Sequence, residues 1–351
     1  MTNEGGPAGP NQTLTEAIDE LCDGAHLTAD HASAALEEIM AGRVSEAQIA
    51  AFLIALRAKG ETVSEVVGLA RTMRSLADSV STARSPLVDT AGTGGGPSTF
   101  NVSTTAALIA VGAGCAVAKH GNRSATSKSG SADLLEALGV AIDLDPGQVG
   151  RCVDEVGFGF MFAPRHHAAT RHVVPVRKAL AVRTIFNLLG PLTNPAGASR
   201  QVVGVADRAY QETIAEALLA LGCERALVVS GDDGADEISI TGATRVIDVR
   251  AGGTSEWSVS PSELGLSEAS IDEVAGGMPA DNAEVTRQIL AGEAGPARDL
   301  ALLNAAAAIL VAGLDEDLPA ALTRASEAVD SGAAAATLAN LIAFTGSPGG
   351  G

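Results

Sequence analysis

Two polar loops on either side of one apolar helix constrain this chain more than any other feature. A glycine-rich turn containing Gly92, Gly95 and Gly96 follows the short apolar run 87–88. The Ala/Val-rich stretch from Thr104 to about Gly114 predicts a buried helix, and a second polar loop follows it. Glycines let backbone N–H groups approach a phosphate closely, and helix N-termini favour anions. The two loops are therefore predicted to form facing walls of a polyanion pocket.

The lysines single out the second loop. The chain has four lysines, at positions 59, 119, 128 and 178, and a net charge of -19. Lys119 and Lys128 both lie in this loop, which indicates a local phosphate site and excludes a general basic surface. A solvated loop explains its serines, but not the succession of Lys119–Arg123 and Lys128–Asp133.

The glycine turn alone is weak evidence, because most such clusters are only turns. It is not a dinucleotide-binding fingerprint, because Pro97 falls where the third glycine should be. It is not a P-loop either, because no Gly-Lys-Ser/Thr closes it.

Composition limits the class of protein. The 351 residues are 46% hydrophobic and only 3% aromatic, with 40 glycines, which predicts an Ala/Val/Leu-packed α/β protein of two lobes. The charge of -19 argues against nucleic acid as a partner. The four cysteines lack metal spacing and indicate free thiols in a reducing cytoplasm. No signal peptide or bilayer-spanning run is expected, so neither is a membrane location.

The order of predicted elements favours an α/β fold with a mostly parallel sheet and a small helical domain before it. Capping patterns at Ser45/Gln48 and Thr62/Glu65 open two of the early helices. Strands are predicted at Cys115–Lys119, Val140–Leu144, Phe158–Phe162, Gln201–Val205, Arg225–Val229 and Thr244–Val249. Helices are predicted at Ser131–Leu138, Gln211–Leu221, within Asp281–Ala312 and at Ser331–Phe344.

The expected domains follow from this order. Residues 1–11 and 346–351 are flexible tails. The helical domain takes residues 12–82 with roughly 176–198, and the α/β domain takes residues 83–175 and 199–345.

Two more clusters carry chemistry. The segment 161–195 is rich in Arg and His; its adjacent His166 and His167 lack zinc spacing, whereas its arginines suit a substrate carboxylate. Asp236 and Glu237 are adjacent in a Gly/Asp-rich loop. Composition alone favours a solvated turn there, with a magnesium site as the alternative.

The ordered motifs GTGG, NVST, KHGNR and SKSGSAD strongly resemble the anthranilate phosphoribosyltransferase family, over nearly the whole chain. The resemblance implies an enzyme of tryptophan biosynthesis, a pentosyltransferase that joins anthranilate to phosphoribosyl pyrophosphate and releases pyrophosphate. It also implies a homodimer, and an architecture shared with the pyrimidine nucleoside phosphorylases.

The resemblance further implies a role for each matching residue. Phosphoribosyl pyrophosphate would be held by Gly92, Gly95, Gly96, Thr99, Asn101, Val102, Ser103, Thr104, Lys119, His120, Gly121, Asn122, Arg123, Ser124, Ala125, Thr126, Ser127 and Ser131. Anthranilate would meet Gly92, His120, Asn122, His167, Arg177, Gly190 and Pro191. Two magnesium ions are expected, with Ser103, Asp236 and Glu237 as ligands. No dedicated acid or base is expected; Lys119 would act electrostatically on the leaving pyrophosphate.

One position departs from the family, whose turn reads GTGGD where this chain has Gly96 and Pro97 after Gly95. The missing carboxylate predicts a weaker magnesium site, which Gly96→Asp would repair, and it leaves open a paralogue that uses another aromatic amine. The alternative is that Gly96 only shapes the turn.

Two other functions remain as alternatives. A pyrimidine nucleoside phosphorylase should carry a Lys-x-Ser-Gly-Arg-Gly type loop, where this chain has Lys128-Ser-Gly-Ser. A non-catalytic relative that binds nucleic acid conflicts with the charge of -19.

Overall fold

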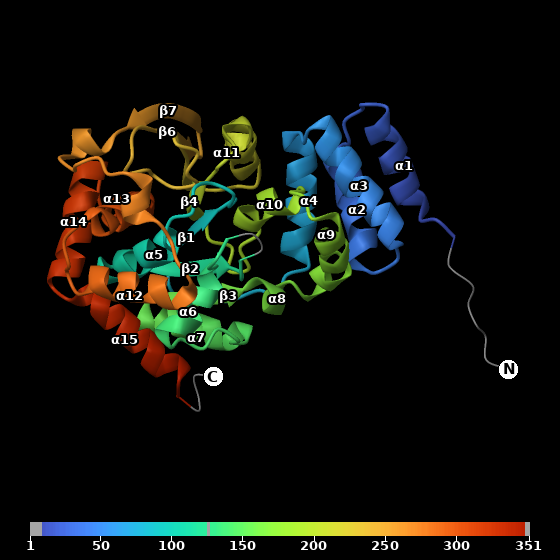
Figure 1. The fold of residues 1–351 in the computed structure, drawn as a ribbon. Helices are drawn as coiled ribbons and strands as arrows, with labels where there is room; N and C mark the ends of the chain where they lie inside the picture. The colour runs from blue at the N-terminus through green and yellow to red at the C-terminus, as the bar shows by residue number, and fades with distance from the viewer. Residues whose placement is uncertain (1–8, 125–126, 348–351) are drawn as a thin grey trace. The chain divides into compact units, whose positions relative to one another are not determined.

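The computed structural model of the protein describes residues 9–124 and 127–347, in two compact units (Figure 1). The helical unit is Met1–Ala77 with His167–Leu189, and the α/β unit is Asp78–His166 with Gly190–Gly351. The later helical segment thus spans 167–189, where 176–198 was expected. Of the two expected tails, residues 1–8 and 348–351 lie outside the described residues.

The helical unit begins with four helices: α1 (Gln12–Cys22), α2 (Ala29–Met40), α3 (Glu46–Lys59) and α4 (Val63–Ser75). Its later segment adds the short helices η1 (Ala168–His172), α9 (Val174–Leu180) and α10 (Phe186–Leu189). The capping box of Thr62 and Glu65 is present at the start of α4.

Asn11 corrects the expected boundary of the N-terminal tail. Its side chain caps α1 by accepting from the Leu14 N–H at 3.1 Å. Its backbone N–H donates to Gln48 Oε1 at 3.0 Å, so the Gln48 side chain joins α1 to α3. Ser45 alone therefore caps α3, by accepting from the Gln48 N–H at 3.3 Å.

The α/β unit is built on a seven-stranded sheet with the order β3-β2-β1-β4-β5-β6-β7. The first five strands in that order are parallel, and β6 and β7 are antiparallel. The strands are β1 (Leu87–Gly92), β2 (Ala116–Gly121), β3 (Phe158–Phe162), β4 (Arg200–Gly204), β5 (Arg225–Gly231), β6 (Thr244–Arg250) and β7 (Gly253–Val259). The predicted α/β class with a mostly parallel sheet is confirmed.

Helices surround this sheet (Figure 1). They are α5 (Val102–Gly112), α6 (Ser131–Leu138), α7 (Pro146–Val156), α8 (Ala163–His166), α11 (Gln211–Ala220), α12 (Pro279–Leu290), α13 (Pro296–Ala312), α14 (Leu318–Asp330) and α15 (Ala333–Thr345). Short 3₁₀ turns are η2 (Gly190–Leu192), η3 (Arg208–Tyr210), η4 (Pro261–Leu264) and η5 (Ile271–Val274). The apolar helices α5 and α13 pack against each other and against β1, and form the centre of the core.

One predicted element was wrong, and a strand was not predicted. Val140–Leu144 is not a strand, although Val140, Ile142 and Leu144 are buried in strict alternation. Alternation reveals one buried face but cannot show whether a sheet edge is free to pair. β7 was not predicted, because it is an edge strand whose residues are mostly exposed and polar and so give no apolar pattern.

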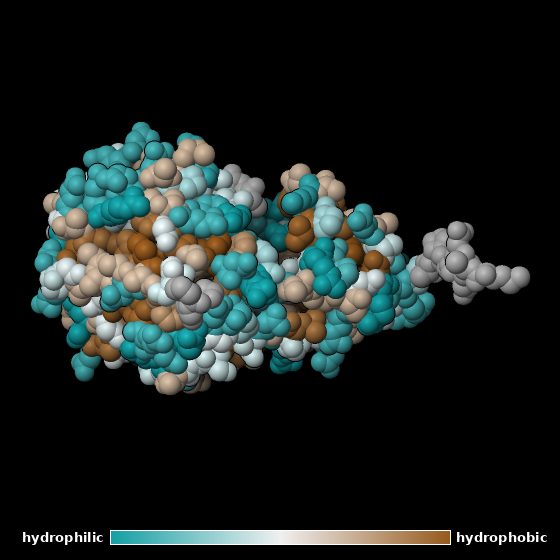
Figure 2. Space-filling view, turned by 90° about the horizontal axis from the view of Figure 1, so that it is seen from below, coloured by the Kyte–Doolittle hydropathy of each residue, from teal (hydrophilic) through white to brown (hydrophobic). Residues whose placement is uncertain are grey.

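Hydrophilic and hydrophobic residues are mixed on the face that Figure 2 shows. Four of the large hydrophobic residues that are more than a third exposed belong to the helical unit: Ile54, Leu76, Val174 and Val182. No single helix in the described part of the chain is long and apolar enough to cross a membrane; only α14 and α15, bent by 62°, pass that test as a pair.

Candidate functional site

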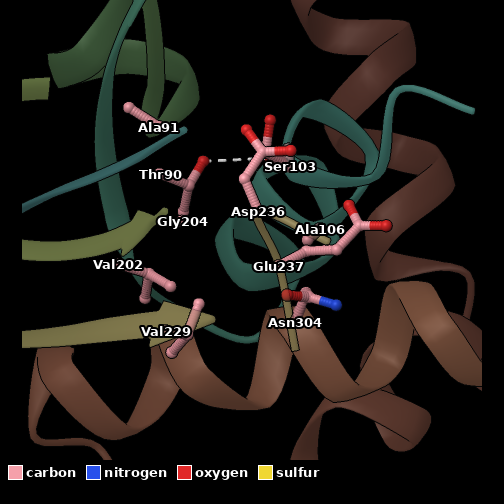
Figure 3. A pocket seen from close by; sticks show the side chains of 10 residues that line it. All are labelled: Thr90, Ala91, Ser103, Ala106, Val202, Gly204, Val229, Asp236, Glu237 and Asn304. Carbon is pink, nitrogen blue, oxygen red and sulfur yellow. Dashed lines mark hydrogen bonds between the residues drawn. The ribbon is translucent and has the colours of Figure 1, made fainter. Parts of the chain in front are cut away.

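The site lies where neighbouring parallel strands end. β1 and β4 end in register at Gly92 and Gly204, and β2 ends at Gly121. Ligands of parallel sheets bind at the C-terminal ends of the strands, which is where the two polar loops were expected to lie. A small cavity of about 20 Å³ opens here, with room for about one water. Its lining, drawn in Figure 3, comprises Thr90, Ala91, Ser103, Ala106, Val202, Gly204, Val229, Asp236, Glu237 and Asn304.

Three glycines make room for the segment that carries Asp236. A Cβ at Gly204 would lie 1.7 Å from the Asp236 carbonyl oxygen, and one at Gly92 would lie 2.2 Å from Asp236 Oδ2. A Cβ at Gly96 would lie 2.5 Å from the carbonyl oxygen of Gly234. None of these three glycines has a positive φ, so close approach is what requires them. Gly96 therefore does more than shape the turn, which was the alternative reading of this position.

The glycine turn itself is made by Gly94 and Gly95, whose φ angles of 66° and 98° favour glycine. The turn presents the Gly94 N–H to Asp236 Oδ2 at 2.7 Å. The 92–96 turn and the 231–238 loop are therefore in direct contact, although they are far apart in the sequence.

Lys119 belongs to the sheet, in agreement with the predicted strand Cys115–Lys119; its expected place in the second polar loop is wrong. It lies in β2 and is only 1% exposed. Its ammonium donates to the Thr90 carbonyl and, at 3.2 Å, to Ser103 Oγ. Burial lowers its pKa to about 8, although the carboxylate of Asp89 acts in the opposite direction. The Lys119 ammonium is thus hydrogen-bonded to the Ser103 hydroxyl, at the N-terminus of α5.

Buried Asp89 and Asn194 hold the end of β2. Asp89 accepts from the His120 N–H at 3.1 Å and from Asn194 Nδ2 at 2.7 Å. Asn194 Nδ2 also donates to the Ala118 carbonyl at 2.8 Å. His120 Nδ1 lies 3.1 Å from the Gly190 carbonyl, so two residues of the predicted anthranilate set, His120 and Gly190, are in contact. Pro191 follows Gly190 in η2.

Asn101 joins the two polar loops. Its Oδ1 accepts from Ser129 Oγ and from Asn282 Nδ2, each at 2.9 Å. Val102, Ser103 and Thr104 form the first turn of α5 directly after it; Val102 and Thr104 are buried, and so do not face solvent.

The rest of the second loop is held by hydrogen bonds among its own residues. The Asn122 carbonyl accepts from Ser131 Oγ at 3.3 Å and from the Ala132 N–H at 3.2 Å. Ser124 Oγ lies 2.6 Å from Ser127 Oγ. Gly121 ends β2, where an added Cβ would lie 2.2 Å from Ser131 Oγ. Ala125 and Thr126, both predicted to contact phosphoribosyl pyrophosphate, lie outside the described residues.

Arg123 is engaged by acidic side chains in this structure. Its guanidinium lies 2.9 Å from Asp133 and 2.5 Å from Glu136, and over the Phe162 ring. About half of the side chain is exposed, so these ion pairs compete with water.

The site disfavours the charged form of Glu237 in the ligand-free protein. Burial, and then the Asp236 carboxylate, raise the pKa of Glu237 well above its usual range, while a hydrogen bond from Thr99 acts against this. In Figure 3 the Asp236 carboxylate lies on the side of the Ser103 hydroxyl, and Glu237 extends in another direction. A cation would relieve this repulsion.

The donor set also fits magnesium, which prefers oxygen ligands and keeps several waters. Ser103, Asp236 and Glu237 line the same cavity. No cluster of three or more His, Cys, Asp or Glu side chains suited to a metal occurs among the described residues. Substrate oxygens and water would therefore have to complete the coordination.

Two residues of the predicted anthranilate set, His167 and Arg177, belong to the helical unit. The Arg177 guanidinium lies 5.3 Å from the centre of the Phe186 ring. Burial lowers its pKa, and no carboxylate pairs with it in the part of the chain that the structure describes. A desolvated, unpaired arginine beside an aromatic ring suits an aromatic carboxylate.

Sequence reasoning missed four residues that shape this site: Asp89, Asn194, Gly204 and Asn304. The only signal for Gly204 was its place after a β-branched run. For Asn304 the only signal was one polar residue in an Ala-rich stretch.

Family models of known proteins match both units of this chain. The glycosyl transferase family a/b domain matches residues 84–335, and the helical bundle domain of that family matches residues 15–77.

The similar proteins with known names are all anthranilate phosphoribosyltransferases in the three cases that follow. Anthranilate phosphoribosyltransferase of Moorella thermoacetica is 50% identical over 94% of this chain and 98% of its own length. The crystal structure of the Thermus thermophilus enzyme has a TM-score of 0.89 at 44% identity, covering 94% of this chain and 99% of that one. The Saccharomyces cerevisiae enzyme in complex with phosphoribosyl pyrophosphate and Mg has a TM-score of 0.87 at 28% identity, covering 94% and 97%. The predicted transfer of a phosphoribosyl group to anthranilate, in tryptophan biosynthesis, is confirmed. This chain belongs to the anthranilate phosphoribosyltransferase family.

Proposed function

We propose that the α/β unit binds phosphoribosyl pyrophosphate with magnesium at the ends of β1, β2 and β4. One observation carries this proposal: the glycine turn, Lys119 and Asp236 all lie near the C-terminal ends of neighbouring parallel strands. Its support from outside the chain is the yeast relative, solved with phosphoribosyl pyrophosphate and Mg.

The phosphates would be held by backbone and hydroxyl groups of the two loops. The turn at Gly92–Gly96 and the N-terminus of α5 supply N–H donors to an anion. The loop from Asn122 to Ser131 adds hydroxyls, and Arg123 exchanges its acidic partners for a phosphate. The roles of Gly95, Thr99, Gly121 and Ser127 follow from their positions in these same loops.

Charge on the departing pyrophosphate is the main demand of the reaction. Bound magnesium would supply charge neutralisation on its oxygens. Asp236, Glu237 and Ser103 would hold the metal; two ions remain our proposal. Lys119 places a fixed positive charge behind the Ser103 hydroxyl. No general base is required of the chain, because the aromatic amine needs placement more than activation.

Anthranilate would be placed by its carboxylate. We assign that role to Arg177, with His120, Asn122, His167, Gly190 and Pro191 as further contacts. The close approach at Gly96 gives a structural reason for its departure from the family pattern, so this glycine is no argument for a different acceptor. Following anthranilate fluorescence after addition of phosphoribosyl pyrophosphate and magnesium tests the activity directly; no change in fluorescence would contradict it.

Arg177→Ala should raise the KM for anthranilate by about 10- to 100-fold, because loss of a charge-assisted hydrogen bond costs about 1.5–3 kcal/mol. The KM for phosphoribosyl pyrophosphate should stay near the wild-type value. Steady-state kinetics with each substrate varied in turn measure both constants. Lys178→Ala, which removes the exposed charge next to it, is the control. An equal rise in both constants would remove Arg177 from the acceptor site.

We also propose a homodimer in the cytoplasm. The helical unit exposes more than a third of Ile54, Leu76, Val174 and Val182, which are available for a contact between two copies. Sedimentation equilibrium of the purified protein tests the dimer.

A further inference from the structure

Asn304 is a buried polar residue in an otherwise apolar stretch of helix. It lies on α13, where every other residue from Leu300 to Ala312 is Ala, Leu, Ile or Val. The side chain is only 5% exposed. Such a residue costs stability unless its amide is fully hydrogen-bonded, so its partners show what it does.

The partners of the Asn304 amide are both backbone groups of one residue. Asn304 Oδ1 accepts from the Ile238 N–H at 2.9 Å, and Nδ2 donates to the Ile238 carbonyl at 2.9 Å. Nδ2 also donates to the Leu300 carbonyl at 3.0 Å, which fixes the side chain to its own helix. The amide therefore pairs with Ile238 as a strand neighbour would, and ties it to the most buried helix of the unit.

Ile238 directly follows Glu237, so this clamp fixes one end of the acidic segment. At its other end, Asp236 is enclosed by Gly92 and Gly204 and accepts from the Gly94 N–H. Asn304 also lines the same cavity as both carboxylates (Figure 3). Nothing in that stretch of backbone belongs to a strand or helix, so its direction depends on these contacts.

We propose that Asn304 is a positioning residue for the transfer reaction: it holds the backbone of Ile238 so that Glu237 and Asp236 keep the positions in which they would hold magnesium. This inference rests on the proposed role of the two carboxylates. An apolar residue would fill the same space, but it would remove the hydrogen-bond partners that the Ile238 N–H and carbonyl have here. The side chain acts on the ligand only through the segment it clamps.

The test uses Asn304→Leu, which keeps the volume and removes the clamp, and Asn304→Asp, which keeps the shape and loses the donor to Ile238. Ile309→Ala is the matched control, because it removes a fully buried side chain from the same helix without touching the cavity. Calorimetry without acceptor measures binding of phosphoribosyl pyrophosphate over a range of magnesium concentrations. Amide hydrogen exchange of residues 231–241, without ligands, reports the clamp itself.

Both Asn304 variants should speed exchange at 231–241 and weaken magnesium-dependent binding by about 10- to 100-fold, as loss of an outer-shell partner does. The KM for anthranilate at saturating phosphoribosyl pyrophosphate should change less than the binding constant. Ile309→Ala should lower the melting temperature and leave binding at the wild-type level.

Wild-type binding in both Asn304 variants would overturn the proposal, as would equal weakening by Ile309→Ala. Asp236→Asn with Glu237→Gln separates this failure from that of the proposed function. If that double variant loses magnesium-dependent binding and the Asn304 variants keep it, only the clamp is rejected. If the double variant keeps it, the metal role of the carboxylates is rejected and the inference about Asn304 with it.

Discussion

Replacing Asp236 with Asn and Glu237 with Gln together should abolish magnesium-dependent turnover and leave the α/β unit folded. Removal of a single charge-stabilising group from an active site costs about 10²–10³ in rate, and here two carboxylates of one site are lost. Stability should not fall in parallel. Burial and the neighbouring Asp236 raise the pKa of Glu237, so its charged form is already disfavoured in the ligand-free protein.

The measurements are the rate against magnesium concentration and the melting temperature without ligands. Asp272→Asn with Glu273→Gln is a matched control, since it neutralises another adjacent Asp-Glu pair, which is exposed in η5. This control should keep the wild-type magnesium response. Turnover at the wild-type rate in the Asp236/Glu237 variant would mean that the two residues form only a solvated turn.

The parts of the site that are local in sequence could be predicted. The turn at Gly94 and Gly95 follows β1, and the buried α5 follows the turn, as the glycines and the Ala/Val run indicate. Each of these features depends on a few neighbouring residues, so a sequence pattern contains all the information needed.

The tertiary contacts of the site could not be predicted in this way. Gly204 looked like an ordinary strand end, yet its missing Cβ is what admits the Asp236 backbone. Asn304 is 66 residues from the Ile238 that it clamps. Lys119 looked like a loop cation and is buried in β2, because the Thr90 carbonyl and Ser103 hydroxyl supply its hydrogen bonds. No pattern at a single position distinguishes these roles from ordinary packing.

The same limit explains the misassigned strand. Val140–Leu144 shows the period-two burial of a strand, but β3 forms the sheet edge next to β2 and takes no further partner among the described strands. Hydrogen bonding between strands depends on which backbone lies alongside, and composition does not encode this.

Gly96→Asp should destabilise the protein and weaken its magnesium response, contrary to what the family pattern suggests. The first added atom, Cβ, would lie 2.5 Å from the Gly234 carbonyl oxygen and 3.2 Å from Ala235 Cα. Both are backbone atoms, so the 234–236 turn must move, and it carries Asp236 with it. Overpacking of this kind costs about 1–3 kcal/mol. Displacing Asp236 also breaks the 2.7 Å hydrogen bond that it accepts from Gly94.

Thermal melting and a magnesium titration of the rate, at fixed phosphoribosyl pyrophosphate, decide between the two views of Gly96. Gly242→Asp is the control: it adds the same side chain to the same unit, where a Cβ meets nothing within 4 Å and φ is not positive. The control should melt near the wild-type temperature with an unchanged titration. If Gly96→Asp instead lowered the magnesium concentration for half-maximal rate without a loss in melting temperature, the turn would have adjusted, and a carboxylate at this position would serve the metal. The backbone contact at Gly234 predicts the opposite for both quantities, because a carbonyl fixed in a turn has no rotamer by which to move aside.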